Sequence, residues 1–256
     1  MGATLIAVER RQQIIDALDR QPFLSGTALA RTLRVSRVTI HRDMRAVAEQ
    51  GLARRVRGGL ARIETPAAAA SFNERRRVLA AEKDRIGAAA ARLVRDGDTI
   101  IMDGGTTTSS MAPYLAAKRV KVITNSLTVA DYLCDHSHND VIVVGGTLHR
   151  GSKVLLGPPA QQTLRQLNAQ TTFVSAGGVT LEGIGHSDSL IVETEKQMIA
   201  RGQQVVLLLD HTKFAGGATM KVCPWTRINK VITDRPVPEK FAAFFKRRKI
   251  AVIIPP

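Results

Sequence analysis

The first part of the chain repeats its apolar positions with the period of a helix. Ile14, Ile15 and Leu18 recur at helical spacing within residues 8–20. Pro22 follows directly, and proline lacks the backbone N–H that would continue a helix. The pattern therefore predicts one amphipathic helix that ends before Pro22.

Two more short helices are predicted before residue 51. Ser25 can cap a helix that carries Leu29 and Leu33, because a serine hydroxyl accepts the free N–H groups of a first turn. Ser36 can cap the next helix, and Gly51 supplies a residue that tolerates the left-handed conformation at a helix end.

Residues 52–63 read as two short strands joined by a glycine-containing turn, which makes a basic hairpin. A segment of small residues opened by Pro66 follows, as is typical of a domain boundary. In the alternative reading its alanines begin the next helix. We place a first domain at 1–63, a linker at 64–74 and a second domain at 75–256.

From about residue 75 helical stretches alternate with short apolar runs. Such alternation predicts a mainly parallel sheet covered by helices, and hence an α/β fold for the second domain. The expected strands are Thr99–Met102, Val120–Thr124, Val141–Val144, Thr172–Ser175, Val205–Leu209, Val231–Thr233 and Ala251–Ile254.

The third predicted helix is apolar behind and basic in front. With Ile40 facing inward, a step of about 100° per residue brings Met44, Val47 and Gly51 to the same side. The opposite side carries Val38, Arg42, Arg45 and Glu49, with His41 on the flank.

Composition and charge limit the possible partners. The formal net charge is +15, and residues 1–65 hold twelve arginines against six acidic residues, which indicates a polyanionic partner. Aromatic residues make up only 4%, which disfavours a single-stranded RNA binder that stacks bases. No apolar run reaches the ~20 residues that span a bilayer, and the basic helix backs onto core positions, which disfavours a membrane-surface role.

The N-terminus shows no signal-peptide core, so we expect a cytoplasmic protein, nucleoid-associated when bound to DNA. The two cysteines, Cys134 and Cys223, form no CxxC motif, and each is expected to be a small buried apolar residue.

The helices and hairpin together predict a winged helix-turn-helix. In such a domain the capped helix enters the major groove, its N-terminus can bind a phosphate, and the hairpin lies along the DNA backbone. The alternative is a solvated basic face on an ordinary three-helix unit, but the combination of caps, basic face and hairpin favours DNA binding. We predict DNA contacts from Ser25, Thr27, Ser36, Arg37, Val38, Thr39, His41, Arg42, Arg45, Arg54, Arg55, Arg57, Gly58 and Gly59.

The pattern Val35-Ser36-x-x-Thr39-Ile40-x-Arg42-Asp43, followed by Glu49-Gln50-Gly51-Leu52-x-Arg54-x-x-x-Gly58-Gly59, resembles the N-terminal signature of the DeoR family of bacterial transcriptional regulators. The chain departs from that signature in two places: His41 replaces the first arginine of an Arg-Arg-Asp motif, and Arg57 stands where the wing often carries histidine. An imidazole changes charge near neutral pH, so we expect DNA affinity to fall modestly from about pH 6 to about pH 8.

The turn after the first strand of the second domain could bind an anion. Residues 103–110 are rich in glycine, threonine and serine and open a helix, so they offer backbone N–H groups and hydroxyls. The P-loop and GxGxxG spacings are absent, and a purely structural turn is an equally good reading of this segment alone. Further polar groups follow the strands at Asn125, Ser126, Gly145 and Gly146 and at Asp210–Lys213, and strand ends converge in parallel sheets.

These same segments, Asp103-x-Gly105-Thr106-Thr107, Val122-Ile123-Thr124-Asn125-Ser126, Gly145-Gly146 and Asp210-x-x-Lys213, are similar to successive motifs of the DeoR family's C-terminal sensor domain. The resemblance implies a fold shared with phosphosugar isomerases and CoA transferases, and a phosphorylated sugar or related metabolite as effector. It implies effector contacts from Asp103, Gly104, Gly105, Thr106, Thr107, Thr108, Asn125, Ser126, Gly145, Gly146, Asp210 and Lys213.

An enzyme is the main alternative. Sugar-phosphate isomerisation needs a carboxylate base, and residues 173–179 lack the acidic cluster that isomerases of this fold carry after a central strand. Glu193 and Glu195 lie on an expected helix from Ser189 to Ala200 as surface or packing charges. His136 and His138 read as a polar loop, so we predict no metal, no cofactor and no catalytic residue.

The sequence therefore predicts a transcriptional regulator, in our interpretation a repressor of carbohydrate metabolism genes. Its expected partners are double-stranded operator DNA and a small-molecule effector. We expect a homodimer or homotetramer, because one recognition helix reads only a half-site. The alternative is an isomerase-like sugar-phosphate enzyme with an accessory DNA-binding domain.

Overall fold

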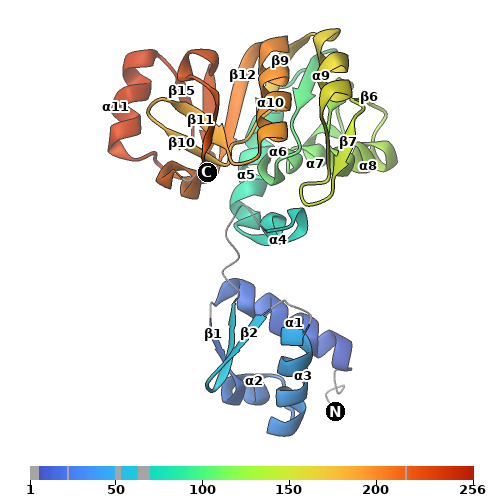
Figure 1. Ribbon diagram of the computed structural model, residues 1–256, viewed down its shortest axis with the longest axis vertical. Helices are drawn as coiled ribbons and strands as arrows, with labels where there is room; N and C mark the ends of the chain where they lie inside the picture. The colour runs from blue at the N-terminus through green and yellow to red at the C-terminus, as the bar shows by residue number, and fades with distance from the viewer. Residues whose placement is uncertain (1–5, 22, 50–52, 63–69, 217) are drawn as a thin grey trace. The chain divides into compact units, whose positions relative to one another are not determined.

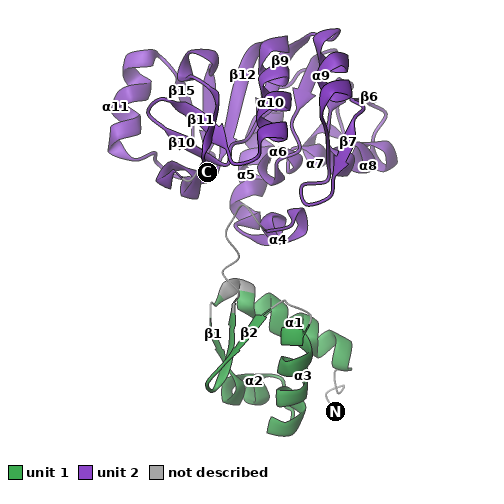
Figure 2. Ribbon diagram, viewed as in Figure 1, with its two compact units in different colours: residues 1–67 green, residues 68–256 purple. Residues whose placement is uncertain are grey.

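The computed structural model describes residues 6–21, 23–49, 53–62, 70–216 and 218–256. It divides the chain into two compact units, unit 1 (residues 1–67) and unit 2 (residues 68–256) (Figure 2). Helix α4 (Phe72–Arg77) belongs to unit 2, so residues 72–74 of the expected linker are helical.

Unit 1 consists of three helices and a small antiparallel sheet. The helices are α1 (Ala7–Arg20), α2 (Gly26–Thr32) and α3 (Arg37–Glu49). The strands β1 (Phe23–Ser25), β2 (Ala53–Val56) and β3 (Gly59–Arg62) lie in the order β1-β3-β2. The predicted hairpin is thus present, and β1, which the sequence pattern did not predict, pairs with its second strand.

The two predicted helix caps differ in the structure. The Ser36 hydroxyl accepts a hydrogen bond from the Thr39 backbone N–H at 3.1 Å, as a cap should. Ser25 occupies the cap position of α2, but its side chain makes no capping hydrogen bond. The expected stop at Gly51 lies outside the described residues. The core of unit 1 is formed by Ile14, Leu18, Leu24, Leu29, Ile40, Met44, Val47, Ala53 and Leu60.

Unit 2 is built on a seven-stranded sheet in which every paired neighbour runs parallel (Figure 1). All seven apolar runs of the sequence appear in it. In spatial order the strands are β15 (Ala251–Ile253), β14 (Lys230–Thr233), β12 (Gly202–Leu209), β9 (Ala169–Val174), β4 (Thr99–Met102), β5 (Lys121–Thr124) and β6 (Asp140–Val143).

Helices cover both faces of this sheet, because side chains alternate along each strand. Ile100 and Met102 of β4 pack in one cluster with helices α5 (Ala80–Ala91), α7 (Ala112–Leu115) and α8 (Leu127–His136). Ile101, between them, packs in another cluster with α9 (Pro158–Arg165) and α10 (Ser189–Arg201). Helix α11 (Glu239–Arg248) joins α10 in a third cluster. The chain thus has a winged helix-turn-helix followed in sequence by a helix-covered α/β sheet, as the sequence predicted.

Several short elements of unit 2 were not predicted. They surround the sheet and include two small antiparallel sheets, ordered β7-β8 and β10-β11-β13. Their bounds are β7 (Thr147–His149), β8 (Val154–Leu156), β10 (Gly178–Thr180), β11 (Gly183–His186), β13 (Met220–Cys223), and the 3-10 turns η1 (His211–Ala215) and η2 (Trp225–Arg227). Helix α6 (Thr106–Ser109) is the helix that the turn after β4 was expected to open.

The cysteines differ in environment. Cys223 is buried as expected, whereas the expectation for Cys134 was wrong, because it lies exposed on the outer side of α8. Among the described residues, no helix is long and apolar enough to cross a bilayer.

Candidate functional site

Helix α3 is fixed to its unit by an apolar side and by one buried carboxylate. Ile40, Met44 and Val47 are buried, as the helical period predicts. Asp43 lies on the same side with an exposed fraction of 1%. Its carboxylate accepts hydrogen bonds from Arg10 Nε at 2.8 Å and Arg11 Nε at 3.2 Å, both on α1. Asp43 thus holds α3 against α1, which sequence periodicity alone did not predict.

The opposite side of α3 is exposed and basic. The predicted contact residues Arg37, Val38, His41, Arg42 and Arg45 are all exposed, and Val38 has the exposed fraction 79%. Such a set of cationic side chains around one apolar side chain suits phosphate oxygens and base edges.

Two of the predicted contact residues are engaged within the helix. Thr39 is half-buried and its hydroxyl lies 2.9 Å from that of Ser36. Arg45 Nε donates to Glu49 Oε1 at 2.8 Å, in an exposed pair spaced by four residues. Exposed pairs of this kind are worth only ~0.3–0.5 kcal/mol, so Arg45 can exchange Glu49 for a phosphate at little cost.

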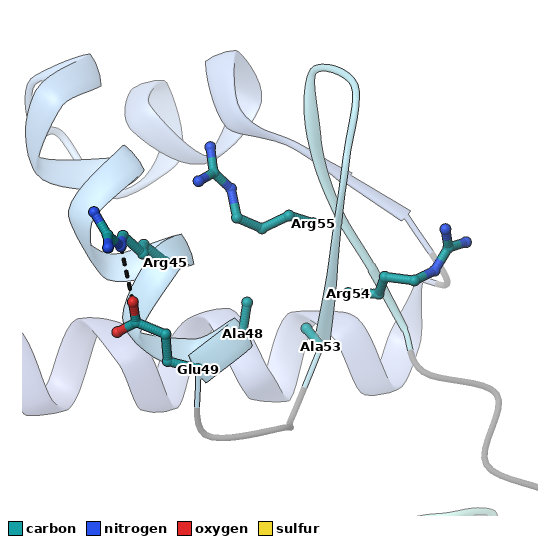
Figure 3. Close-up of a pocket in the computed structure, with 6 residues that line it drawn as sticks. All are labelled: Arg45, Ala48, Glu49, Ala53, Arg54 and Arg55. Atoms are coloured by element: carbon teal, nitrogen blue, oxygen red, sulfur yellow. Dashed lines mark hydrogen bonds and ion pairs between the residues drawn. The ribbon is translucent and has the colours of Figure 1, made fainter.

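The wing places its arginines on different sides of the hairpin. Arg54 and Arg55 both line a pocket that α3 shares through Arg45 and Glu49. Figure 3 shows the Arg55 side chain reaching toward α3, while the end of the Arg54 side chain points to the other side of the hairpin. Arg57 is exposed at the tip of the hairpin. The wing therefore carries positive charge on the side that faces α3, where the DNA groove would lie, and also on its other side.

The two wing glycines have backbone roles. Gly58 has a φ of +88°, which a residue with a side chain rarely adopts. A Cβ on Gly59 would lie 2.0 Å from the Leu24 carbonyl oxygen, so only glycine lets β3 approach β1. The Gly58 carbonyl accepts the Gly26 N–H at 2.9 Å, which ties the wing to α2. Beside this junction Ser25 is half-buried and Thr27 is exposed.

In unit 2 the turn after β4 is organised by Asp103. One carboxylate oxygen accepts the Gly105 N–H at 3.0 Å and the Thr108 hydroxyl. The other accepts the Ser175 N–H at 2.8 Å and the Ser175 hydroxyl at 3.0 Å. Since both oxygens are occupied, Asp103 shapes the turn and joins it to the end of β9. Gly104, Thr106 and Thr107 of the same turn are buried.

The predicted residues after β5 and β6 lie at the same edge of the sheet. Asn125 is buried, its Nδ2 donates to the Leu155 carbonyl at 3.3 Å, and its Oδ1 has no hydrogen-bond partner among the described residues. The Ser126 hydroxyl caps α8 by accepting the Val129 N–H at 3.3 Å. Gly145 and Gly146 are exposed, and Gly146 has a φ of +128° in the turn toward β7.

The end of β12 contributes Asp210 and Lys213. Asp210 is buried and accepts the Thr212 N–H at 3.1 Å and the Thr212 hydroxyl, so it caps the turn η1. Lys213 is half-buried one residue further along that turn. The Asp210 carboxylate therefore shapes the loop that carries Lys213.

Three basic side chains that the sequence interpretation did not include interact electrostatically with groups at this edge. They are Arg75 of α4, Lys83 of α5 and His186 of β11. Burial lowers the pKa of Lys83 to about 8, against the opposing charge of Asp210. Burial also lowers the pKa of Arg75, against the charge of Asp103. Burial and then the positive charge of Arg75 lower the pKa of His186. Local sequence gave no signal for this set, because its members come from three separate elements.

One buried acid of unit 2 has no ion pair among the described residues. Glu195 of α10 has an exposed fraction of 6%, and its Oε2 has no hydrogen-bond partner within the described part of the chain. Burial first and the charge of Asp103 second raise its pKa well above the usual value. Glu193, by contrast, is exposed and pairs with Lys196 at 2.7 Å.

The described residues contain no cluster of three or more histidine, cysteine or acidic side chains that could hold a metal ion. What the strand ends do offer is a group of buried or half-buried cations beside hydroxyls and turn glycines. The guanidinium and ammonium groups of Arg75, Lys83 and Lys213 stand beside the hydrogen-bond donors of the turns, and such a combination is suited to an anionic ligand.

Comparison with known proteins assigns both units. Residues 10–66 match the DeoR-like helix-turn-helix domain, and residues 79–235 match the DeoR C-terminal sensor domain. The chain belongs to the DeoR family. The family assignment made from the Ser36–Gly59 and Asp103–Lys213 motifs is therefore confirmed.

DeoR-family relatives match the chain over nearly its whole length. The uncharacterised HTH-type transcriptional regulator YgbI of Escherichia coli is 30% identical over 98% of each chain. The HTH-type transcriptional repressor GlcR of Bacillus subtilis is 29% identical, over 96% of this chain and 95% of the relative. This DeoR-family chain is accordingly a DNA-binding transcriptional regulator with a sensor domain.

Among solved structures, ribose 5-phosphate isomerase A of Methanocaldococcus jannaschii is similar with a TM-score of 0.37 and 16% identity, over 52% of this chain and 53% of that one. A similarity with this TM-score and identity carries no information on the activity of the DeoR-family chain.

Proposed function

We propose that this regulator represses carbohydrate metabolism genes by binding operator DNA through unit 1, and that a phosphorylated sugar bound to unit 2 controls it. One observation carries the proposal: a basic helix locked by Asp43 occurs in the same chain as a cation-rich edge at the ends of parallel strands. A phosphate would neutralise that edge, and sugar hydroxyls would meet the threonine and asparagine side chains there. The Bacillus subtilis relative is by name a repressor.

The proposed DNA contacts are the exposed residues of α3 and the wing, with Ser25, Thr27 and Ser36 near the backbone. The regulator would act as a homodimer or homotetramer, since two recognition helices are needed to read two half-sites about 34 Å apart. Arg42 would read a base edge, and Arg54, Arg55 and Arg57 would hold phosphates.

The proposed effector contacts are Thr106, Thr107 and Thr108 of the turn, Asn125, and Lys213, with Asp103 and Asp210 shaping the loops that present them. Gly104, Gly105, Ser126, Gly145 and Gly146 would form the walls. Asn125 Oδ1 suits a sugar hydroxyl, because it is a buried acceptor without a partner among the described residues.

An isomerase would need a free carboxylate base in this place, and Asp103 and Asp210 are engaged by their own loops. We therefore propose a sensor that lacks catalytic turnover. Incubation with pentose and hexose phosphates should give no isomerised product; measurable turnover would favour the enzyme.

The test of the proposed function combines DNA and effector. The purified protein should bind its own promoter region with a preference over random sequence that persists at several salt concentrations. A screen of phosphorylated and unphosphorylated sugars by thermal shift should identify an effector that stabilises the fold and changes promoter affinity. The proposed pocket is wrong if Lys213→Ala and Thr106→Ala leave that change unaltered.

A further inference from the structure

Helix α4 occupies a particular place in the chain. It spans Phe72–Arg77, between the two segments that match the family domains, and so it follows the DNA-binding unit directly in sequence. Three consecutive arginines end it. Arg76 and Arg77 are exposed, whereas Arg75 is half-buried. Arg75 is therefore turned toward the protein while its two neighbours face solvent.

The N-terminal end of α4 is fastened to the loop between β7 and β8. The Phe72 ring is buried, and the Phe72 N–H donates to the Gly151 carbonyl at 2.7 Å. Lys153 Nζ lies 3.2 Å from Asn73 Oδ1 and 5.9 Å from the centre of the Phe72 ring. Ser71 and Glu74 cap the helix reciprocally. These contacts define where α4 sits on unit 2.

The C-terminal end of α4 is held by Lys83. The chain reverses at Leu79, which has a φ of +53°, and the Lys83 ammonium then donates to the carbonyls of Arg75 and Val78. Lys83 is 5% exposed, and the charges of Asp210 and Lys213 at the effector edge affect its pKa. One buried cation thus ties the end of α4 to the proposed effector site.

The Arg75 side chain lies at the same effector edge and has N–H donors that are not hydrogen-bonded within the described residues. Helix α4 packs against α6, the helix that begins at Thr106 (Figure 1). The Arg75 Nη2 donates to the Ser152 hydroxyl at 3.1 Å, and its Nε is buried with no partner in the described part of the chain. The Arg75 charge acts on Asp103 and His186. A guanidinium in this state fits the two oxygens of an anion.

We infer that Arg75 is an effector-binding residue that takes up an anionic group of the ligand, so that α4 is part of the ligand site. This inference rests on the effector site proposed above. Because α4 is the first helix after the DNA-binding unit, a ligand that holds Arg75 also favours one position of α4. The ligand can shift the equilibrium between DNA-competent and DNA-incompetent arrangements by as much as its affinities for the two arrangements differ.

A purely structural role for Arg75 makes a different prediction. If the side chain served only to fasten α4 through Ser152, then Ser152→Ala would weaken the site as much as Arg75→Ala does. If Arg75 binds the ligand, Ser152→Ala leaves ligand affinity unchanged or raises it, because the guanidinium no longer divides its hydrogen bonds between hydroxyl and anion.

The experiment uses inorganic phosphate as the probe and the full chain. Phosphate affinity is measured from thermal shifts of the fluorescence of Trp225, the only tryptophan, with potassium chloride as an ionic-strength control. Arg75→Ala should weaken phosphate binding by about tenfold or more, as expected for loss of a charge-assisted hydrogen bond. Arg75→Lys, which keeps the charge and loses the planar fork, should fall between Arg75→Ala and wild type. Arg76→Ala is the matched control and should bind like wild type.

The possible outcomes separate the two proposals. One outcome is that wild type binds phosphate and that the variants Arg75→Ala, Arg75→Lys and Arg76→Ala bind phosphate as well as wild type does. In that case the Arg75 inference is overturned while the effector site stands. If Ser152→Ala loses phosphate binding together with Arg75→Ala, the role of Arg75 is structural and the inference is again overturned. If wild type shows no phosphate-dependent shift beyond that of potassium chloride at the same ionic strength, while Lys213→Ala also changes nothing, the proposed effector site itself fails.

Discussion

At the scale of single residues, buried carboxylates are accommodated in the sensor unit in two different ways. Asp103 and Asp210 accept hydrogen bonds from N–H and hydroxyl donors of the loops around them. Glu195 has no such donor at Oε2 within the described residues, and burial raises its pKa well above the usual value. The difference follows from hydrogen bonding, because a buried carboxylate without donors is more stable protonated.

Glu195 should make the stability of unit 2 depend on pH. Because its pKa is higher in the folded than in the unfolded state, the folded state binds more protons, and stability falls as pH rises from about 4.5 toward the folded pKa. The variant Glu195→Gln lacks this loss of stability. Its melting temperature should therefore exceed that of wild type by at least about 2 °C near pH 8, and this difference should shrink toward pH 4.5. Trp225 fluorescence during thermal unfolding measures the two melting temperatures.

The control for that prediction is Glu193→Gln on the same helix. Glu193 is exposed and paired only with Lys196, so its removal should leave the melting temperature nearly unchanged across the pH range. A Glu195→Gln variant whose advantage does not grow with pH would show that the Glu195 carboxyl is not neutral in the folded protein.

His41 gives a second prediction at this scale. It is exposed on α3 where relatives of this signature carry arginine, and a DNA phosphate would favour its protonated form. His41→Arg should abolish a modest loss of operator affinity from about pH 6 to about pH 8 and should steepen the salt dependence by up to ~0.9 in logarithmic slope. Fluorescence anisotropy with an operator duplex measures both, and an unchanged pH profile in His41→Arg would exclude His41 as its source.

The sequence predicted the kinds of residue at both sites better than their roles. Asp103 was expected to touch the effector, yet its oxygens are occupied by Gly105, Thr108 and Ser175. The partner Ser175 directly follows another strand, β9, and local spacing cannot show a contact across the sheet. Arg75 was missed for a related reason: only the packing of α4 shows which of three adjacent arginines turns inward.

At the scale of elements, regular apolar patterns were sufficient to predict the strands of the seven-stranded sheet. Each of the seven parallel strands corresponds to an apolar run, because a strand covered on both faces must be apolar throughout. The strands of the two small antiparallel sheets are three or four residues long. Strands this short give no extended apolar run, and β11 also pairs with β13, which lies more than thirty residues further along the chain, so their own residues carry little signal.

The docking of α3 on α1 should depend on Asp43. Removing a buried carboxylate from an ion pair destabilises proteins by roughly 3–5 kcal/mol, so Asp43→Ala should destabilise unit 1 strongly and abolish operator binding. Glu49→Ala removes the exposed pair with Arg45 and should cost no more than about 0.5 kcal/mol.

The position of Trp225 makes this measurable in the full chain. Trp225 lies in unit 2, so its fluorescence follows that unit during urea unfolding, whereas far-ultraviolet circular dichroism follows both. Asp43→Ala should move only the dichroism transition to lower urea. If the fluorescence transition moves by the same amount, the two units unfold as one and the assignment of the effect to unit 1 fails.

At the scale of the whole molecule, regulation requires that occupancy of one unit changes the affinity of the other. Such coupling is reciprocal: if the effector weakens operator binding by some factor, saturating operator must weaken effector binding by the same factor, typically about 5–150-fold. The same holds in the opposite direction if the effector strengthens operator binding. Because α4 lies between the matched family segments and carries Arg75, it is the element through which we expect the coupling to act.

This reciprocity can be measured with the sugar phosphate that gives the largest thermal shift. Its affinity is titrated with and without a saturating operator duplex, and operator affinity is titrated with and without the sugar phosphate, at constant ionic strength. The two factors should agree, and Arg75→Ala should reduce both together while Arg76→Ala leaves both as in wild type. A change in operator affinity without the matching change in sugar-phosphate affinity would mean that the anion acts on the DNA contacts as salt does, since only a shared conformational equilibrium makes the two factors equal.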